Sequence, residues 1–161
     1  MPHTFTFPDA VRDCADIDDR FLKSGLGALT SQYTKKITQE NNVKISGSVY
    51  LDDALRPIAE AGDKCVDYAI GVQVALREDD CVIFLEVHEA NDGSVKTVKD
   101  KFEFIKKWLK EGGTSLDRLK RKLIWIASGS SHLSQASLRR LNALGIVFHG
   151  GHLTINKYLF L

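Results

Sequence analysis

The segment that most constrains the fold is Cys65–Ala90, which has the pattern of two strands joined by a polar turn. Its first half, Val66–Ala75, alternates between larger apolar residues and small or polar ones, as expected of a strand with two different faces. Its second half, Cys81–Val87, is apolar almost throughout, which is typical of a strand covered on both sides. Arg77–Asp80 has the polarity of a hairpin loop. The sequence therefore predicts a buried antiparallel hairpin.

An acidic residue interrupts the apolar second strand of this hairpin. Glu86 directly follows the apolar run Cys81–Leu85, so its carboxylate is expected in or beside the protein interior, where an unpaired charge is costly. His88 lies two positions further on and shares the face of Glu86, about 7 Å away at roughly 3.4 Å per residue. Glu86 therefore needs a compensating partner on that face.

A second acidic residue, Asp67, is predicted to lie on the same side of the sheet. A four-residue loop would pair Leu76 with Cys81 and would set Asp67 opposite Ala90. Asp67 then shares the face of Glu86 but lies four positions along from it, unless a bulge or bend closes the gap.

Two carboxylates that converge on one face are suitable ligands for a hard divalent cation. Mg²⁺, or Mn²⁺ in its place, takes one or two protein carboxylates together with water and phosphate oxygens. His88 beside Asp67 and Glu86 would position a water molecule. The alternative from the residues alone is that the two acids mark strand ends and that His88 is an edge histidine.

The pattern of Asp67, eighteen intervening residues and Glu86-Val87-His88 in a hydrophobic hairpin resembles the PD-(D/E)XK nuclease superfamily, which has the restriction-endonuclease-like fold. The resemblance implies that an Asp and a later acid hold Mg²⁺, while a Lys two residues after that acid activates water or stabilises charge. Asp67 and Glu86 match the two acidic positions. His88 stands at the Lys position, and no Pro precedes Asp67.

A helix is predicted over residues 95–111, directly after the turn Asn91–Gly93. In the superfamily this helix packs on the catalytic hairpin, and in some members it is thought to supply a replacement catalytic residue. Lys99, beside the inner stripe, is therefore the candidate for the missing lysine, and three other lysines are candidates for contacting nucleic acid. The inner stripe comprises Val95, Val98, Phe102, Ile105 and Leu109, and the candidate nucleic-acid-binding residues are Lys96, Lys101 and Lys106.

The charge of the chain is distributed unevenly. Residues 96–122 contain ten Lys or Arg and four acids, although the formal net charge of the whole chain is only +1. A basic segment next to a carboxylate site suits a polyanion such as DNA or RNA. A solvated amphipathic helix would give the same pattern.

The remaining elements predict one α/β domain, residues 1–161, in which residues 1–26 form an N-terminal helical extension. The order is helix, three strands, helix, strand, helix, strand. This order predicts a restriction-endonuclease-like core with a mixed sheet of about five strands flanked by helices. The other expected elements are a helix from about Asp9 to Gly25, a helix over 26–40, a strand over 43–55, a strand over 123–127, a helix from Ser134 to Gly145 and a final strand over 146–148.

Several function classes are not favoured by the composition. The three cysteines lack CxxC spacing and are expected to be reduced thiols rather than zinc ligands. There is no apolar run of about 18 residues and no signal-peptide pattern, so a cytoplasmic protein with no membrane partner is expected.

The sequence predicts a Mg²⁺-dependent endonuclease, and two other functions remain open. The first is a catalytically inactive binding, regulatory or immunity-type module on the same fold, which the replacement of Lys by His88 favours. The second is a zinc hydrolase built on the scattered histidines. A homodimer or another protein partner is also open.

Overall fold

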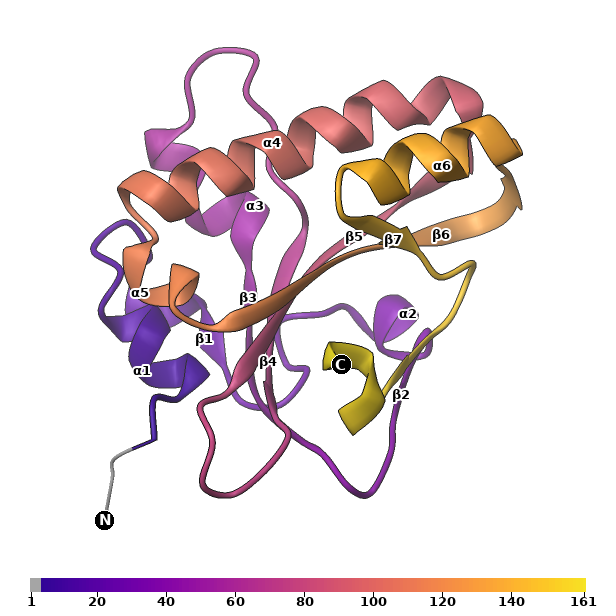
Figure 1. Cartoon of the computed structure of the whole chain (residues 1–161). Coiled ribbons are helices and arrows are strands. Elements are labelled where there is room, and N and C mark those ends of the chain that lie inside the picture. The colour runs from indigo at the N-terminus through magenta and orange to yellow at the C-terminus, as the bar shows by residue number, and fades with distance from the viewer. Residues whose placement is uncertain (1–3) are drawn as a thin grey trace.

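The expected hairpin is present and lies inside a mixed six-stranded sheet (Figure 1). The computed structural model describes residues 4–161. The sheet order is β1-β3-β4-β5-β6-β7, with antiparallel pairing from β1 to β5 and parallel pairing from β5 to β7. The expected α/β class with a mixed sheet is therefore confirmed, with one strand more than expected. The strands are β1 Leu22–Lys23, β3 Lys44–Tyr50, β4 Tyr68–Gln73, β5 Cys81–Asn91, β6 Lys120–His132 and β7 Ile146–Phe148.

Helices cover one face of the sheet, and the longest of them is α4, Val95–Glu111 (Figure 1). Phe102 of α4, Phe84 of β5 and Trp125 of β6 are fully buried in the core between helices and sheet. This layer holds the amphipathic helix against the strand that carries Glu86. The other helices of this core are α1 Phe7–Arg12, α3 Leu51–Ala54, α5 Thr114–Asp117 and α6 Gln135–Ala143.

The opposite face of the sheet is covered by a small second sheet and the C-terminal segment. Strands β2 (Ile37–Gln39) and β8 (Leu153–Ile155) pair in parallel, and Leu153, Ile155 and Phe160 are buried against the residues of this face. Because β5 and β6 lie between two cores, their apolar residues alternate between both of them. This explains the continuous apolar run of the second hairpin strand. Short helical turns complete the chain: α2 Ser31–Thr34, η1 Asp19–Phe21, η2 Arg56–Ile58, η3 Asp92–Ser94 and η4 Lys157–Phe160.

The expected long N-terminal helix is wrong. Helix α1 ends at Arg12, and the chain then continues through turns in which Cys14 N–H donates to Val11 and Ile17 N–H donates to Cys14. These three-residue steps keep Val11, Cys14 and Ile17 buried, so a series of turns reproduces the spacing of a helix. The last residues before position 26 include β1, which joins the main sheet.

The expected helix over residues 26–40 is also wrong. Only α2 is helical there, and β2 follows it because Ile37–Gln39 pairs with β8, far along the chain. A long-range strand pairing therefore overrides the helix-like apolar spacing of this segment.

Other boundaries follow from strand pairing. The expected strand over 43–55 is β3 followed by the helical turn α3, with a bulge between Ile45 and Gly47. The expected strand over 123–127 is extended at both ends, because β6 pairs with β5 from Lys120 to His132. The helix over 95–111 and the strand over 146–148 are confirmed, and α6 begins after the N-cap residue Ser134 as expected.

Candidate active site

The two predicted acids meet where β4 begins and β5 passes beside it. The backbone N–H of Asp67 donates to Glu86 Oε1 at 3.1 Å. The backbone N–H of Val87 donates to Asp67 Oδ2 at 2.9 Å. Each carboxylate is therefore fixed by the backbone of the segment that carries the other, and both lie close together on the face that α4 covers.

The expected register of the hairpin is wrong, and the observed register brings the acids closer. Val72, rather than Leu76, pairs with Cys81, and Tyr68 pairs with Leu85. The loop between β4 and β5 is consequently longer than the expected four-residue turn. This shift removes the four-position offset between Asp67 and Glu86 without any bulge in this strand pair.

A lysine from α4 completes the cluster. Lys101 Nζ lies 2.6 Å from Glu86 Oε2, and the side chains of Lys101 and Glu86 are 15% and 0% exposed. We call Asp67, Glu86 and Lys101 the acid–lysine cluster. The sequence predicts Lys101 as a contact to nucleic acid and Lys99 as the replacement lysine. Lys99 is half-buried and has no hydrogen bond or ion pair within residues 4–161.

Helical spacing places Lys101 beside the inner stripe of α4. This residue lies three positions after Val98 and four before Ile105, both of which face the core. Lys99 has the equivalent spacing, four positions after Val95 and three before Phe102, so helical spacing alone does not separate the two lysines.

Burial dominates the electrostatics of the cluster. Burial, followed by the negative charge of Asp67, raises the pKa of Glu86 to about 8, although the ammonium of Lys101 opposes this shift. Burial also raises the pKa of Asp67, against the hydrogen bond from Val87 and the charge of Lys101. For Lys101, burial disfavours the charged form, but the carboxylate of Glu86 outweighs it and the pKa is raised. The cluster therefore sets one strongly held ammonium against two carboxyl groups, one of which readily keeps a proton.

Asp52 of α3 adds negative charge near this cluster. Its charge contributes to raising the pKa values of both Asp67 and Lys101. Its carboxylate also lies 3.7 Å from Arg56 and is 38% exposed, so it remains partly in contact with water.

The other predicted site residues lie outside the cluster. His88 follows Glu86 on β5, but its Nδ1 is 2.9 Å from the carbonyl oxygen of Glu89. Lys96 pairs with Asp100 at 2.9 Å on the exposed side of α4. Lys106 donates to the carbonyl oxygen of Leu144 at 2.9 Å. Of the three lysines assigned to nucleic acid, only Lys101 is thus brought to the two acids.

The chemistry of the donor set fits a hard divalent cation. Asp67 and Glu86 supply carboxylate oxygens from adjacent strands, and Asp67 Oδ1 has no hydrogen bond within residues 4–161. Because two carboxyl groups face one ammonium, a dication that displaces the proton of Glu86 would find two carboxylate ligands here. Within that same range no group of three or more His, Cys, Asp or Glu side chains could hold a metal ion, so a cation here would take its remaining ligands from water or phosphate.

The cysteines and histidines form no further site in the part of the chain that is described. Cys14, Cys65 and Cys81 are all free and buried. His152 Nε2 lies 2.6 Å from Thr38 Oγ1, and burial lowers the pKa of His149. Nothing in this arrangement supports the zinc alternative.

None of the helices described over residues 4–161 is both long and apolar enough to cross a membrane. Comparison with known proteins found no matching family model, no similar curated protein and no similar solved structure. The acid–lysine cluster is therefore interpreted from its own geometry.

Proposed function

We propose that the chain is a Mg²⁺- or Mn²⁺-dependent nuclease with a restriction-endonuclease-like core, whose reacting centre is the acid–lysine cluster. The observation that carries this proposal is the convergence of Asp67, Glu86 and Lys101 on one face of the sheet. Two acids and one lysine are the residue types that the PD-(D/E)XK pattern requires. Here the lysine comes from α4 instead of from position 88 on the strand.

Each residue of the cluster has a distinct role in this proposal. Asp67 and Glu86 would hold the cation, which supplies polarisation of the scissile phosphate and a lower pKa for the attacking water. Lys101 would place its fixed positive charge beside the phosphate, where negative charge develops in the transition state. His88 would orient the water or accept its proton.

The reaction would be a phosphodiester hydrolysis. The water oxygen forms a bond to phosphorus, the bond from phosphorus to the leaving sugar oxygen breaks, and that oxygen takes up a proton. Glu86 is fully enclosed and held by Lys101, so substrate binding requires Lys101 to release it. Lys101 then becomes available to the phosphate.

A second function remains in competition because of this closed arrangement. An ammonium already satisfies Glu86, as in a structural ion pair, which favours a catalytically inactive binding, regulatory or immunity-type module. In such a protein the acid–lysine cluster would contribute only to the stability of the fold.

Cleavage assays separate the two functions. The purified protein should cut DNA or RNA in the presence of Mg²⁺ or Mn²⁺, and Glu86→Ala should abolish cutting while the circular dichroism spectrum stays folded. Asp67→Asn should lower the rate by about 10²–10³-fold, as is typical when one preorganised electrostatic group is lost. Glu78→Gln, at an exposed position in the loop between β4 and β5, is the control and should cut normally. Persistent cutting by Glu86→Ala would contradict the nuclease proposal.

A further inference from the structure

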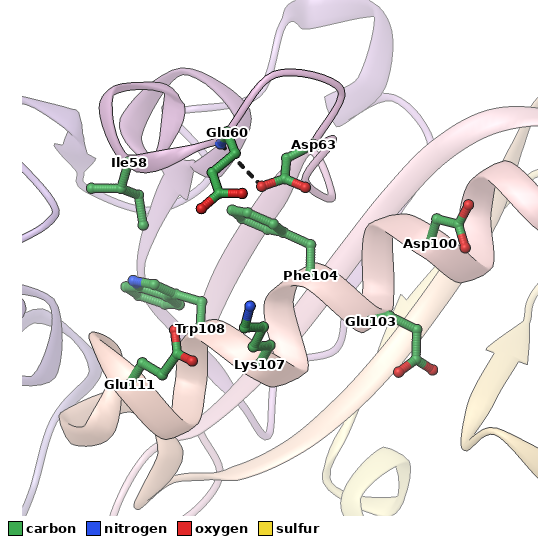
Figure 2. Close-up of a pocket in the computed structure, with 9 residues that line it drawn as sticks. All are labelled: Ile58, Glu60, Asp63, Asp100, Glu103, Phe104, Lys107, Trp108 and Glu111. Atoms are coloured by element: carbon green, nitrogen blue, oxygen red, sulfur yellow. Dashed lines mark hydrogen bonds between the residues drawn. The ribbon is translucent and has the colours of Figure 1, made fainter.

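A pocket of about 340 Å³ lies between α4 and the segment 58–63, away from the acid–lysine cluster (Figure 2). Its apolar part is formed by Phe104, Trp108 and Ile58, and Ile58 is 41% exposed. The Trp108 indole is fixed from behind, because its Nε1–H donates to Asp16 at 2.9 Å. Trp108 is only 3% exposed and Phe104 is half-buried, so Phe104 offers the larger aromatic surface in this pocket.

Carboxylates surround this aromatic surface. Glu60 and Asp63 extend from the loop toward Phe104, and the loop is held in shape because Glu60 N–H donates to Asp63 Oδ2 at 3.0 Å (Figure 2). Glu111 lines the pocket at the C-terminal end of α4. Lys107 is the only base among the lining residues.

The pocket keeps a negative charge after its ion pairs are considered. Two further lining acids lie near lysines outside the pocket: Asp100 is 2.9 Å from Lys96, and Glu103 is 3.9 Å from Lys106. Glu60, Asp63 and Glu111 have no ion pair within residues 4–161, and Lys107 alone opposes them. A polyanion such as nucleic acid would therefore be repelled from this pocket.

An aromatic face bordered by carboxylates is suited to a cation on an apolar stem. A guanidinium stacks on an aromatic ring and donates to carboxylates in its own plane, whereas an ammonium is more strongly hydrated. The volume lies at the low end of the range for ligand pockets, about 300–1,000 Å³, which suits one side chain. A neighbouring pocket of about 300 Å³, which shares Asp63, Asp100 and Phe104 and is also lined by Lys64, leaves room for the flanking residues of a peptide.

We propose that this pocket binds an arginine side chain presented by a basic segment of a partner protein. The guanidinium would stack on Phe104 and pair with Glu60 and Asp63, while the aliphatic stem would contact Ile58. None of the residues that line the pocket belongs to the acid–lysine cluster. The proposal goes beyond nuclease activity and does not depend on it.

Nuclear magnetic resonance titration of the full chain tests this assignment. The probe is the peptide acetyl-Gly-Gly-Arg-Gly-Gly-amide, whose two ends carry no charge. The control is the same peptide with neutral citrulline in place of Arg. The arginine peptide should shift the amide signals of residues 58–64 and the indole signal of Trp108, and the citrulline peptide should not. Equal shifts with both peptides, or shifts confined to other regions, would overturn the proposal.

Matched variants test the contacts. Glu60→Gln should weaken binding of the arginine peptide about tenfold, as expected for a lost hydrogen bond between charged groups. Phe104→Leu, which keeps an apolar side chain but removes the ring, should weaken it about threefold, in line with the loss of a cation–π contact at a partly exposed site. Glu78→Gln removes the same charge outside the pocket and should change the affinity less than twofold. If Glu78→Gln and Glu60→Gln weakened binding equally, the affinity would depend only on the net charge of the protein. That result would contradict specific binding in this pocket.

The source of the cation is tested by one further titration. Free arginine amide should bind more weakly than the peptide, because it cannot use the neighbouring pocket. If the free amino acid derivative binds as tightly as the peptide, the partner is a small molecule and the assignment to a protein segment is wrong.

Discussion

Helix α4 contributes to two acidic regions that differ in their access to water. In the acid–lysine cluster, Glu86 is fully buried and its carboxylate is held by Lys101 at 2.6 Å. In the pocket on another face of α4, Glu60 is exposed and Lys107 has no ion pair within residues 4–161 (Figure 2). The segment that begins at the pocket with Ile58 leads directly into Asp67 of the cluster.

This difference shows how burial divides similar side chains into different roles. Buried carboxyl groups have raised pKa values and must be balanced by a specific partner, which suits them to hold a cation or a proton. Exposed carboxylates remain hydrated and are free to pair with a charged ligand that approaches from solvent. The two regions should therefore respond very differently to the same substitution.

The largest contrast is expected for removal of a lysine charge. Lys101→Met leaves Glu86 buried without its partner and should lower the free energy of unfolding by about 3 kcal/mol at pH 8.5. Lys107→Met should change it by less than about 0.5 kcal/mol, as is usual at the surface. Urea unfolding followed by tryptophan fluorescence measures both values. If the two substitutions changed the free energy of unfolding by similar amounts, the buried pair of Lys101 and Glu86 would stabilise the fold no more than a surface lysine does.

A smaller contrast is expected in the pH dependence of stability. The pKa of Glu86 is about 8 in the folded protein, compared with an ordinary value of 4.5. Between these two values the folded state keeps a proton that the unfolded state has lost, so stability should fall as pH rises from about 4.5 to 8. Glu86→Gln, which has no proton to lose, should flatten this slope, while Glu60→Gln should leave it as in the wild type. Thermal unfolding across this pH range provides the measurement.

The smallest effect is expected when a positive charge is added to the strand that carries Glu86. His88→Lys restores the residue that the PD-(D/E)XK pattern places two positions after the acid, and it should leave the cutting rate unchanged or raise it by up to about tenfold. His152→Lys, an exposed position on the opposite side of the sheet, is the control and should have no effect. A loss of cutting in His88→Lys would mean that the imidazole itself is required.

The parts of the fold that could be predicted are those determined by a local pattern. The inner stripe of α4 repeats over the whole helix, and its bounds agree with the structure. The hairpin was identified from alternation, but its register was not, because Val74 and Leu76 continue the alternation beyond the end of β4. Leu76 is in fact 83% exposed in the loop. Alternation alone cannot show where a strand stops pairing.

The sequence was sufficient to predict the two acids of the site but not its lysine. Asp67 and Glu86 stand out in the sequence because charged residues border buried strands. Lys99 and Lys101 are only two residues apart on the same helix, and the choice between them depends on how α4 is rotated against β5. That rotation is set by packing of the whole helix, so the structure was needed to identify Lys101.

Titration of the protein with Mn²⁺ by isothermal calorimetry tests the central claim most directly. In the proposed site, Asp67 and Glu86 bind a cation that competes with the Lys101 ammonium for the Glu86 carboxylate. The wild type should then bind Mn²⁺, and Glu86→Gln should not. Lys101→Met should bind Mn²⁺ at least about tenfold more tightly, because the competing ammonium is gone. If neither the wild type nor Lys101→Met binds Mn²⁺, the acid–lysine cluster is a structural ion pair and the proposed nuclease is wrong.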